Sequence, residues 1–210
     1  MDELEVVYRW VDGVYVKAGL ADRKMALLVA IAGLSDGRKV VLALQRGQRE
    51  STESWSRLLR DFRDRGLRAP RLGIGDGHLG IWAALRNVFP EAYEQRCWNQ
   101  RMVKVLDRVG RRDQPVARDL LREVAYAESL ARARRAKTAF QQWCEQRAYA
   151  DAGGLLDQDW ERLTTFYSFP PEHWGPLRTT NPVESPFAAL RLRTAAAKPF
   201  KQVENATAVI

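Results

Sequence analysis

The chain has 210 residues, of which 46% are hydrophobic and seven are tryptophan, and its formal net charge is +8. This length and apolar content favour one large or two small globular domains with a real core. No apolar run approaches the length of a membrane span, and no signal peptide opens the sequence. The pI near 9.8 favours a polyanionic partner, nucleic acid above all, although basic surfaces also occur without one.

The two cysteines, Cys97 and Cys144, have neither a CxxC pairing nor the Cys/His spacing of a zinc site. We therefore expect reduced thiols in a cytosolic protein. The chain opens almost directly on a strand pattern and closes on KQVENATAVI, which is typical of a helix beginning. Both ends indicate a fragment of a longer protein.

The first 47 residues predict three successive strands. Residues 5–16 are rich in Val and Tyr, and residues 26–33 form the continuous apolar run of a buried strand. The turn signal SDGR at 35–38 then leads into a returning strand at 39–44. We expect these strands to pair antiparallel.

The period then changes to that of alternating helices and strands. In residues 51–66, apolar side chains recur at i, i+3, i+4 and i+7, with Ser51 or Thr52 as the cap and Gly66 at the end. The following segments predict a strand at 71–75, a helix at 78–89 and a fifth strand at 92–97.

Residues 99–161 contain no strand signal and are helical in period and composition, with a break expected at Gly153-Gly154. A proline-rich, aromatic loop, FPPEHWGP, follows. A final helix is expected from Pro182, with Asn181 as its N-cap.

This order of elements is that of the ribonuclease H fold. The prediction is an α/β protein with a mixed five-stranded sheet, flanking helices and an all-α insertion before the last helix. Residues 1–98 and 177–210 would form the catalytic core, and residues 99–176 the insertion.

Three acidic residues fall at significant places in this order. Asp12 lies in or at the end of the first strand, Asp76 directly follows the fourth, and Glu184 opens the last helix. The first and fourth strands are neighbours in such a sheet, so their acids can lie close together. The alternative is local: Asp-Gly dipeptides favour turns, and a Glu in the first turn of a helix can serve as a cap.

Three converging carboxylates would need a cation, because like charges raise each other's pKa. Hard cations such as Mg²⁺ or Mn²⁺ prefer oxygen ligands. Two such ions about 4 Å apart can activate a water or a 3′-hydroxyl in phosphodiester chemistry. We therefore predict Asp12, Asp76 and Glu184 as ligands of two divalent metal ions.

The chain also resembles the catalytic domain of Mutator-type bacterial transposases, a DDE family with a ribonuclease H-like fold. Each matching block is short, but their order and spacing span nearly the whole chain. The blocks are VDGVYVK (11–17), LSDGRKVVLAL (34–44), ESTESW (50–55), GDGHLGIWAAL (75–85), FPEAYEQRCW (89–98), FYSFPPEHW (166–174) and LRTTNPVESPFAALRLRT (177–194).

The resemblance places the family's acidic triad on Asp12, Asp76 and Glu184. It also exposes a departure, because the family usually has Cys-x-x-His where this chain has Cys97 followed by Gln100. Glutamine cannot take or give a proton as imidazole does. We regard His78, Cys97 and Gln100 as residues that could support the site from outside the metal shell.

Basic residues after position 177 are the predicted DNA-binding track: they outnumber acids by five to one across 177–201. They are Arg178, Arg191, Arg193, Lys198 and Lys201. The aromatic residues from Phe166 to Trp174 could stack on an unpaired base or pack within the fold. The run ARARRAK at 131–137 is more typical of a solvated helix face.

The predicted function is a transposase catalytic domain, with metal-dependent hydrolysis and strand transfer at transposon ends. The alternatives are a non-catalytic, DNA-binding remnant of a transposase, or a resolvase or nuclease on the same fold. The resemblance implies transposon-end and target DNA as partners, a homo-oligomer at full length, and a bacterial, nucleoid-associated location in the cytoplasm. In such transposases an N-terminal region supplies DNA-end recognition, and it is not among these 210 residues.

Overall fold

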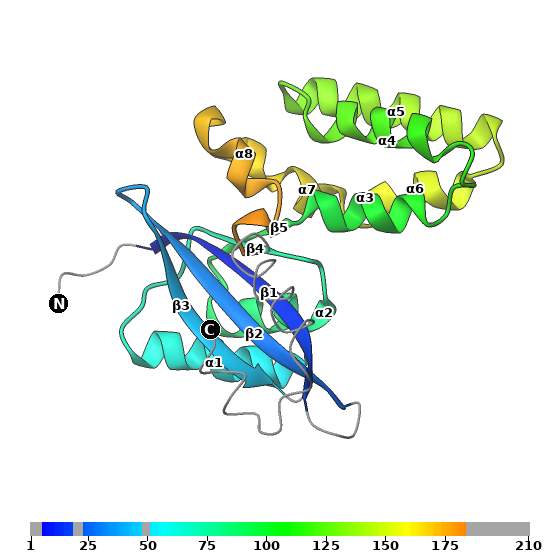
Figure 1. Cartoon of the computed structure of the whole chain (residues 1–210). Helices are drawn as coiled ribbons and strands as arrows, with labels where there is room; N and C mark the ends of the chain where they lie inside the picture. Colours follow the sequence, from blue (N-terminus) through cyan, green and yellow to red (C-terminus); the bar gives the residue numbers. More distant parts are fainter. Residues whose placement is uncertain (1–5, 19–22, 48–50, 184–210) are drawn as a thin grey trace. The chain divides into compact units, whose positions relative to one another are not determined.

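The computed structural model describes residues 6–18, 23–47 and 51–183. Five strands form one sheet in the order β3-β2-β1-β4-β5 (Figure 1). Strand β1 (Val6–Ala18) pairs antiparallel with β2 (Arg23–Leu34), which pairs antiparallel with β3 (Lys39–Gly47). On its other side β1 pairs parallel with β4 (Leu72–Gly75), and β5 is Tyr93–Arg96. The mixed sheet and its strand order confirm the predicted α/β, ribonuclease H-like fold.

The turn between β2 and β3 follows from its sequence. Gly37 has a φ of 85°, a conformation in which glycine has no steric penalty. The carboxylate of Asp36 accepts a hydrogen bond from the Arg38 backbone N–H at 2.9 Å, and Leu34 N–H donates to Arg38 O at 2.9 Å. This closes the hairpin where the SDGR signal predicted it.

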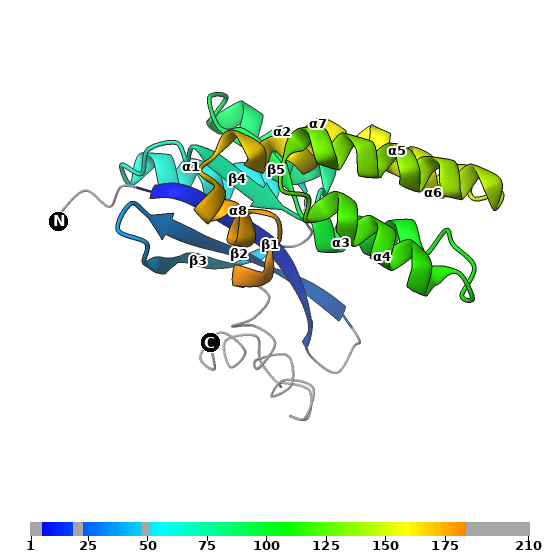
Figure 2. The ribbon, with the colours of Figure 1, turned by 90° about the horizontal axis from the view of Figure 1, so that it is seen from above.

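Helices α1 (Thr52–Asp64) and α2 (Leu79–Val88) pack on one face of the sheet (Figures 1 and 2). Ser51, one of the two predicted caps, caps α1 by accepting from Ser54 N–H at 3.2 Å. The predicted apolar side of α1 is buried and forms one cluster with α2 and β1. That cluster includes Val11, Trp55, Leu58, Leu59, Phe62, Ile81, Trp82 and Leu85.

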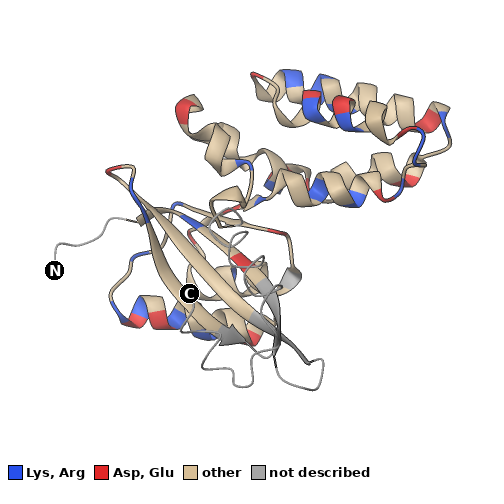
Figure 3. Cartoon of the chain, viewed as in Figure 1, with Lys and Arg blue, Asp and Glu red and all other residues tan. Residues whose placement is uncertain are grey.

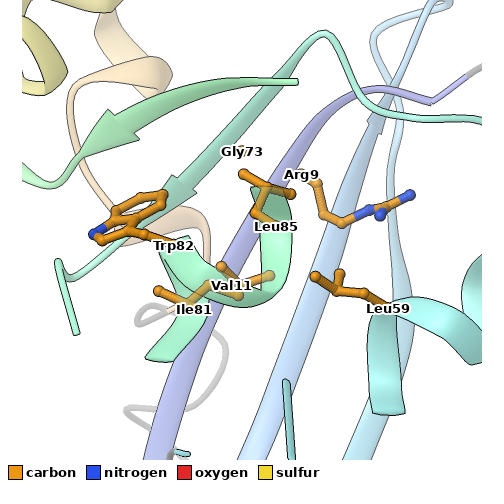
Figure 4. A pocket seen from close by; sticks show the side chains of 7 residues that line it. All are labelled: Arg9, Val11, Leu59, Gly73, Ile81, Trp82 and Leu85. Atoms are coloured by element: carbon orange, nitrogen blue, oxygen red, sulfur yellow. The ribbon is translucent and has the colours of Figure 1, made fainter. Parts of the chain in front are cut away.

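A buried arginine lies inside this packing. Arg9 of β1 is 1% exposed, and its guanidinium lies 5.0 Å from the Phe62 ring centroid and 5.2 Å from that of Phe89. None of its three nitrogen atoms donates a hydrogen bond to a described residue. Beside it is a cavity of about 10 Å³, lined otherwise by apolar residues and Gly73 (Figure 4). Arg9 was not among the residues predicted from the sequence.

The chain between β5 and residue 180 is helical wherever it is regular, as predicted for 99–161. Its α-helices are α3 (Trp98–Leu106), α4 (Gln114–Ala125), α5 (Leu130–Gln146), α6 (Ala150–Gln158), α7 (Trp160–Thr164) and α8 (Trp174–Leu177). Two 3₁₀ turns, η1 (Thr165–Ser168) and η2 (Pro171–His173), precede α8. The FPPEHWGP segment, predicted as a loop, is therefore largely made of short helical turns.

The predicted break at Gly153-Gly154 is wrong, because α6 runs through both glycines. The chain turns earlier, at Ala148, which has a φ of 60°. A Cβ on Gly153 would lie 3.4 Å from Cys144 Cβ and 3.6 Å from the Gln141 backbone of α5. Gly153 thus lets α6 approach α5 closely, which is a long-range packing role that a local breaker rule cannot detect.

By its internal contacts the chain divides into two compact units: a sheet unit, comprising the described residues up to Tyr93 and from Thr180 on, and a helical unit, Glu94–Thr179. Basic and acidic residues alternate along the helices of the helical unit (Figure 3). Arg132, Arg134 and Arg135 of the ARARRAK run are exposed, and Arg132 pairs with Glu128 at 2.9 Å. No helix in the described part of the chain is long and apolar enough to cross a membrane.

A buried ion-pair network fixes the start of the helical unit. Arg96 of β5 and Arg101 of α3 both pair with Asp159, and these three side chains are 7%, 3% and 10% exposed. Arg162 bridges Asp159 at 3.6 Å and Glu94 at 2.5 Å. The carbonyl of Leu163 also accepts hydrogen bonds from Gln95 Nε2 at 3.1 Å and Trp98 Nε1 at 2.8 Å. Apart from the local Arg162–Asp159 pair, these contacts join segments about 60 residues apart in the sequence.

Candidate active site

The parallel pairing of β1 and β4 brings two of the three predicted acids to adjacent strand ends. The register pairs Tyr8 with Leu72, Arg9 with Gly73, and Trp10 with Ile74. Continued by two residues, it sets Asp12 opposite Asp76. Neighbouring strands lie about 4.8 Å apart, so the two carboxylates fall in one neighbourhood.

The alternation of side chains sends both acids to the same face of the sheet. Val11 belongs to the cluster under α1 and α2, so Asp12 points to the opposite face. A Cβ on Gly75 would lie 3.3 Å from Trp82 of α2, so position 75 faces that helix and position 76, by alternation, faces away. Asp12 is 7% exposed, and Asp76 is half-buried.

A tight turn fixes the Asp76 carboxylate. Its Oδ1 accepts a hydrogen bond from the His78 backbone N–H at 2.8 Å, across Gly77, which has a φ of 89°. His78 is the N-cap of α2, and its Nδ1 accepts from Gly80 N–H at 3.3 Å. Asp76-Gly77 thus forms a turn, as the local alternative predicted. The hydrogen bond of this turn uses Oδ1 of Asp76 and does not involve Oδ2. The imidazole of His78 is exposed and acts here as a helix cap.

The third predicted acid, Glu184, lies outside the described residues. Helical conformation begins at Asn181, and Val183 N–H donates to Thr180 O at 2.8 Å. Asn181 is therefore the first helical residue rather than the predicted N-cap, a difference of one position. Within the described ranges, no three His, Cys, Asp or Glu side chains gather as a metal site.

Two of the three residues expected to support the site, Cys97 and Gln100, lie at the start of α3, in the helical unit. Cys97 is the N-cap residue, with a fully buried thiol and no side-chain capping hydrogen bond. Gln100 is half-buried one turn later. Their supporting role stays a prediction.

The DNA-binding residues predicted beyond position 183, Arg191, Arg193, Lys198 and Lys201, also lie outside the described residues. Arg178 is described and belongs to the helical unit. It is half-buried, and its guanidinium lies 4.9 Å from the centroid of the Phe166 ring and 5.0 Å from that of the Tyr126 ring. Burial lowers its pKa.

The strand order and the two aligned carboxylates define an α/β protein of the ribonuclease H-like class. The family model described as "Transposase, Mutator family" matches residues 3–210. The chain belongs to this family.

Two of its relatives are named transposases of insertion sequences. The transposase for insertion sequence element IS6120 of Mycolicibacterium smegmatis is 44% identical over 194 residues, which cover 92% of this chain and 60% of the relative. That for element IST2 of Acidithiobacillus ferrooxidans is 40% identical over 178 residues, covering 84% and 60%. The chain therefore spans about 60% of the length of these relatives.

Among solved structures, a chain in the cryoEM structure of a simian T-cell lymphotropic virus intasome in complex with PP2A regulatory subunit B56 gamma aligns with 61% of this chain. The alignment covers 51% of that chain, with 14% identity and a TM-score of 0.32. A similarity at this level carries no argument about function.

Proposed function

We propose that this chain is the catalytic domain of a DDE transposase. It would hydrolyse a phosphodiester at a transposon end and then join the freed 3′-hydroxyl to target DNA. The observation that supports the proposal is the β1–β4 register, which, extended two residues beyond its last pair, aligns Asp12 with Asp76 on the face away from α1 and α2. Family membership supports the same chemistry.

The donor set fits a hard divalent cation. Both residues offer carboxylate oxygens, the ligands that Mg²⁺ and Mn²⁺ prefer, and two adjacent carboxylates are stable together only with a positive charge between them. Asp12 and Asp76 would hold the metal, with Glu184 as the proposed third ligand. When bound, a metal pair lowers the pKa of an attacking water and stabilises the leaving oxygen.

The chain's own contribution is to orient these oxygens. Asp12 is held within the paired part of β1, opposite Val29 of β2. Asp76 is held by the turn to His78, which directs one carboxylate oxygen into the α2 N-terminus. Ligands fixed in this way need little reorganisation when DNA arrives. The net charge of +8 would supply sequence-independent contacts to DNA phosphates.

The test is nicking of supercoiled plasmid DNA by the full chain with Mn²⁺ or Mg²⁺, against the same reaction with EDTA. We expect slow, metal-dependent nicking that Asp12→Asn and Asp76→Asn abolish. Asp64→Asn is the matched control, because Asp64 is an exposed acid at the end of α1. Nicking by Asp76→Asn at the wild-type rate would refute the proposed site.

Gln100 favours a second candidate, a DNA-binding remnant without catalysis, because the family usually has His at this position. An amide cannot exchange a proton during the reaction. If this substitution limits the chain, Gln100→His should raise the nicking rate. A wild-type chain and a Gln100→His variant that both bind DNA but never nick it would support the remnant.

A further inference from the structure

Arg178 has an unusual setting in the helical unit. Its guanidinium lies 5.0 Å from the Tyr126 ring centroid, 4.9 Å from that of Phe166 and 6.0 Å from that of Trp174. Both polar groups of its backbone are hydrogen-bonded. The Arg178 N–H donates to Trp174 O at 3.1 Å, and its carbonyl accepts from Trp98 N–H at 2.9 Å. The cation is therefore held in one place among three rings.

This guanidinium has no acidic partner among the described residues, and its Nε, like those of Arg96 and Arg101, is buried without a hydrogen-bond partner. Buried arginines of the same unit are arranged differently, since Arg96 and Arg101 both pair with Asp159. A half-buried cation without a counterion is expensive to maintain unless a ligand completes it. The aromatic faces compensate part of this cost through cation–π attraction.

The surrounding rings form a rigid platform. Phe166 is fully buried, and its ring centroid lies 4.2 Å from that of Tyr167, which lies 4.8 Å from that of Trp174. Tyr167 donates its hydroxyl to Ala127 O at 2.8 Å, and Trp174 Nε1 donates to Phe169 O at 2.7 Å. These bonds fix the rings in advance, so a ligand that stacks here orders few side chains.

One ring of the group remains at the surface. Tyr126, the residue after α4, is 56% exposed although its ring lies against the Arg178 guanidinium. An exposed aromatic ring backed by a fixed cation matches two features of a nucleotide: a π face, and a phosphate or base edge that accepts hydrogen bonds. Fully paired double-stranded DNA presents phosphates but keeps its base faces stacked. It would therefore use the guanidinium and leave the aromatic ring without a partner.

We propose that Tyr126 and Arg178 bind an unpaired nucleotide of the DNA substrate. The inference rests on the proposed function for its choice of ligand. The base stacks on the exposed ring of Tyr126, and the Arg178 guanidinium donates to an acceptor on the same nucleotide. An acidic segment of another protein would satisfy the guanidinium but leave the ring unused.

The experiment measures binding of the full chain, by fluorescence anisotropy in EDTA, to two labelled duplexes. One carries a single unpaired thymine, and the other has an abasic residue at that position. Base stacking on an aromatic ring contributes about 1–3 kcal/mol, so the wild type should prefer the thymine duplex by about 5- to 150-fold. Tyr126→Ala should bind both duplexes equally, and Arg178→Lys should lose most of the preference because an ammonium lacks the planar guanidinium.

Two controls keep the result specific. Tyr126→Phe retains the ring and should keep the preference. Tyr93→Ala removes a tyrosine of similar exposure, 62%, from the sheet unit, and should also keep it. Circular dichroism melting establishes that each variant is folded.

The inference would be overturned if wild type bound the thymine and abasic duplexes with equal affinity. It would also be overturned if Tyr126→Ala kept the preference for the thymine duplex. An acidic peptide that displaces the DNA would also overturn the inference, provided that it binds wild type and Tyr126→Ala equally well but does not bind Arg178→Lys. That result would mean that the site recognises an acidic segment and does not use the ring. The proposed catalytic function fails separately, if wild type does not nick plasmid DNA with Mn²⁺. Nicking without the thymine preference would leave that function standing and remove only the nucleotide site.

Discussion

Arg9 of the sheet unit and the arginine pair Arg96 and Arg101 of the helical unit compensate buried positive charge in opposite ways. In the sheet unit, Arg9 lies between two phenylalanine rings and meets no carboxylate among the described residues. In the helical unit, Arg96 and Arg101 converge on Asp159. A buried arginine therefore need not belong to an ion pair. The kind of group that compensates the buried charge determines how much folding stability is lost when that group is removed.

In the sheet unit, the compensation is diffuse. Phe62 lies in the last turn of α1 and Phe89 follows the end of α2, so Arg9 lies near the C-terminal ends of two helices. Those ends carry partial negative charge. Burial lowers the pKa of Arg9 to about 10, which still leaves the side chain charged at neutral pH. Several weak contributions share the stabilisation, and no single acidic partner carries it.

In the helical unit, the compensation is concentrated on one carboxylate. Burial and the neighbouring Arg96 lower the pKa of Arg101 to about 10, so this cation also stays charged. Replacing Asp159 with Asn should destabilise the chain by about 3–5 kcal/mol, because two buried guanidinium groups would lose their counterion. Urea unfolding gives the total change. Hydrogen exchange should rise first in 98–177 while the helices of the sheet unit keep their protection.

Asp151→Asn is the control for this variant, because Asp151 is an exposed acid in the first turn of α6. It should change stability by less than about 1 kcal/mol. If Asp159→Asn is as mild as Asp151→Asn, the network is not what holds the helical unit together.

Two glycines, one in each unit, extend the comparison to backbone packing. A Cβ on Gly33 of β2 would lie 2.9 Å from the Trp10 ring, which is almost fully buried, so Gly33→Ala should destabilise the sheet unit by about 1–3 kcal/mol. Gly154 of α6 is exposed, with no atom within 4 Å of a Cβ, so Gly154→Ala should stabilise by about 0.5–1 kcal/mol. Thermal melting of both variants would give shifts of opposite sign. Shifts of the same sign would contradict this packing.

Helix caps should respond alike in both units, since they are local. Ser51 caps α1 and Ser129 caps α5, each accepting a backbone N–H three residues on at 3.2 Å. Ser→Ala at either position should cost about 1 kcal/mol. Chemical denaturation of the Ser→Ala and Ser→Thr variants at each site measures the free energy of unfolding. The Thr variants should retain most of the stability that the Ala variants lose. A loss at only one site would mean that its serine has a further role.

Local patterns predicted most of the fold, and long-range packing accounts for what they missed. The strands, α1 with its Ser51 cap, and the β2–β3 turn follow from periods and turn residues within a few positions. The neighbouring placement of Asp12 and Asp76 needed only the element order. Gly153 was misread because its reason, the approach of α6 to α5, lies outside its own segment. Asp159 pairs with residues about 60 positions away, and no local pattern reports such a partner.

Arg9 could have been noticed from the sequence, because it lies two positions before Val11 and so shares the face of β1 that packs against α1 and α2. Its compensation could not, since Phe62 and Phe89 come from two different helices. Glu184 remains a prediction, supported by the family's motif order and by a helical start at Asn181.

The smallest expected effect is that of Arg9→Met, and it tests the comparison most directly. Methionine has similar length, needs no counterion and can fill the space between the two rings, so the free energy of unfolding at pH 7 should stay within about 1 kcal/mol of wild type or rise. The pH dependence should also differ. Burial lowers the folded pKa of Arg9 from its usual value to about 10, so its charge penalises folding fully well below pH 10 and less as the pH rises through and above 10. Wild type should therefore gain stability relative to Arg9→Met across that range, as measured by denaturant titrations at pH 7 and pH 10.5. A loss of more than about 3 kcal/mol in Arg9→Met at pH 7 would instead mean that Arg9 has a strong, specific partner like that of Arg96 and Arg101, and the contrast between the two units would disappear.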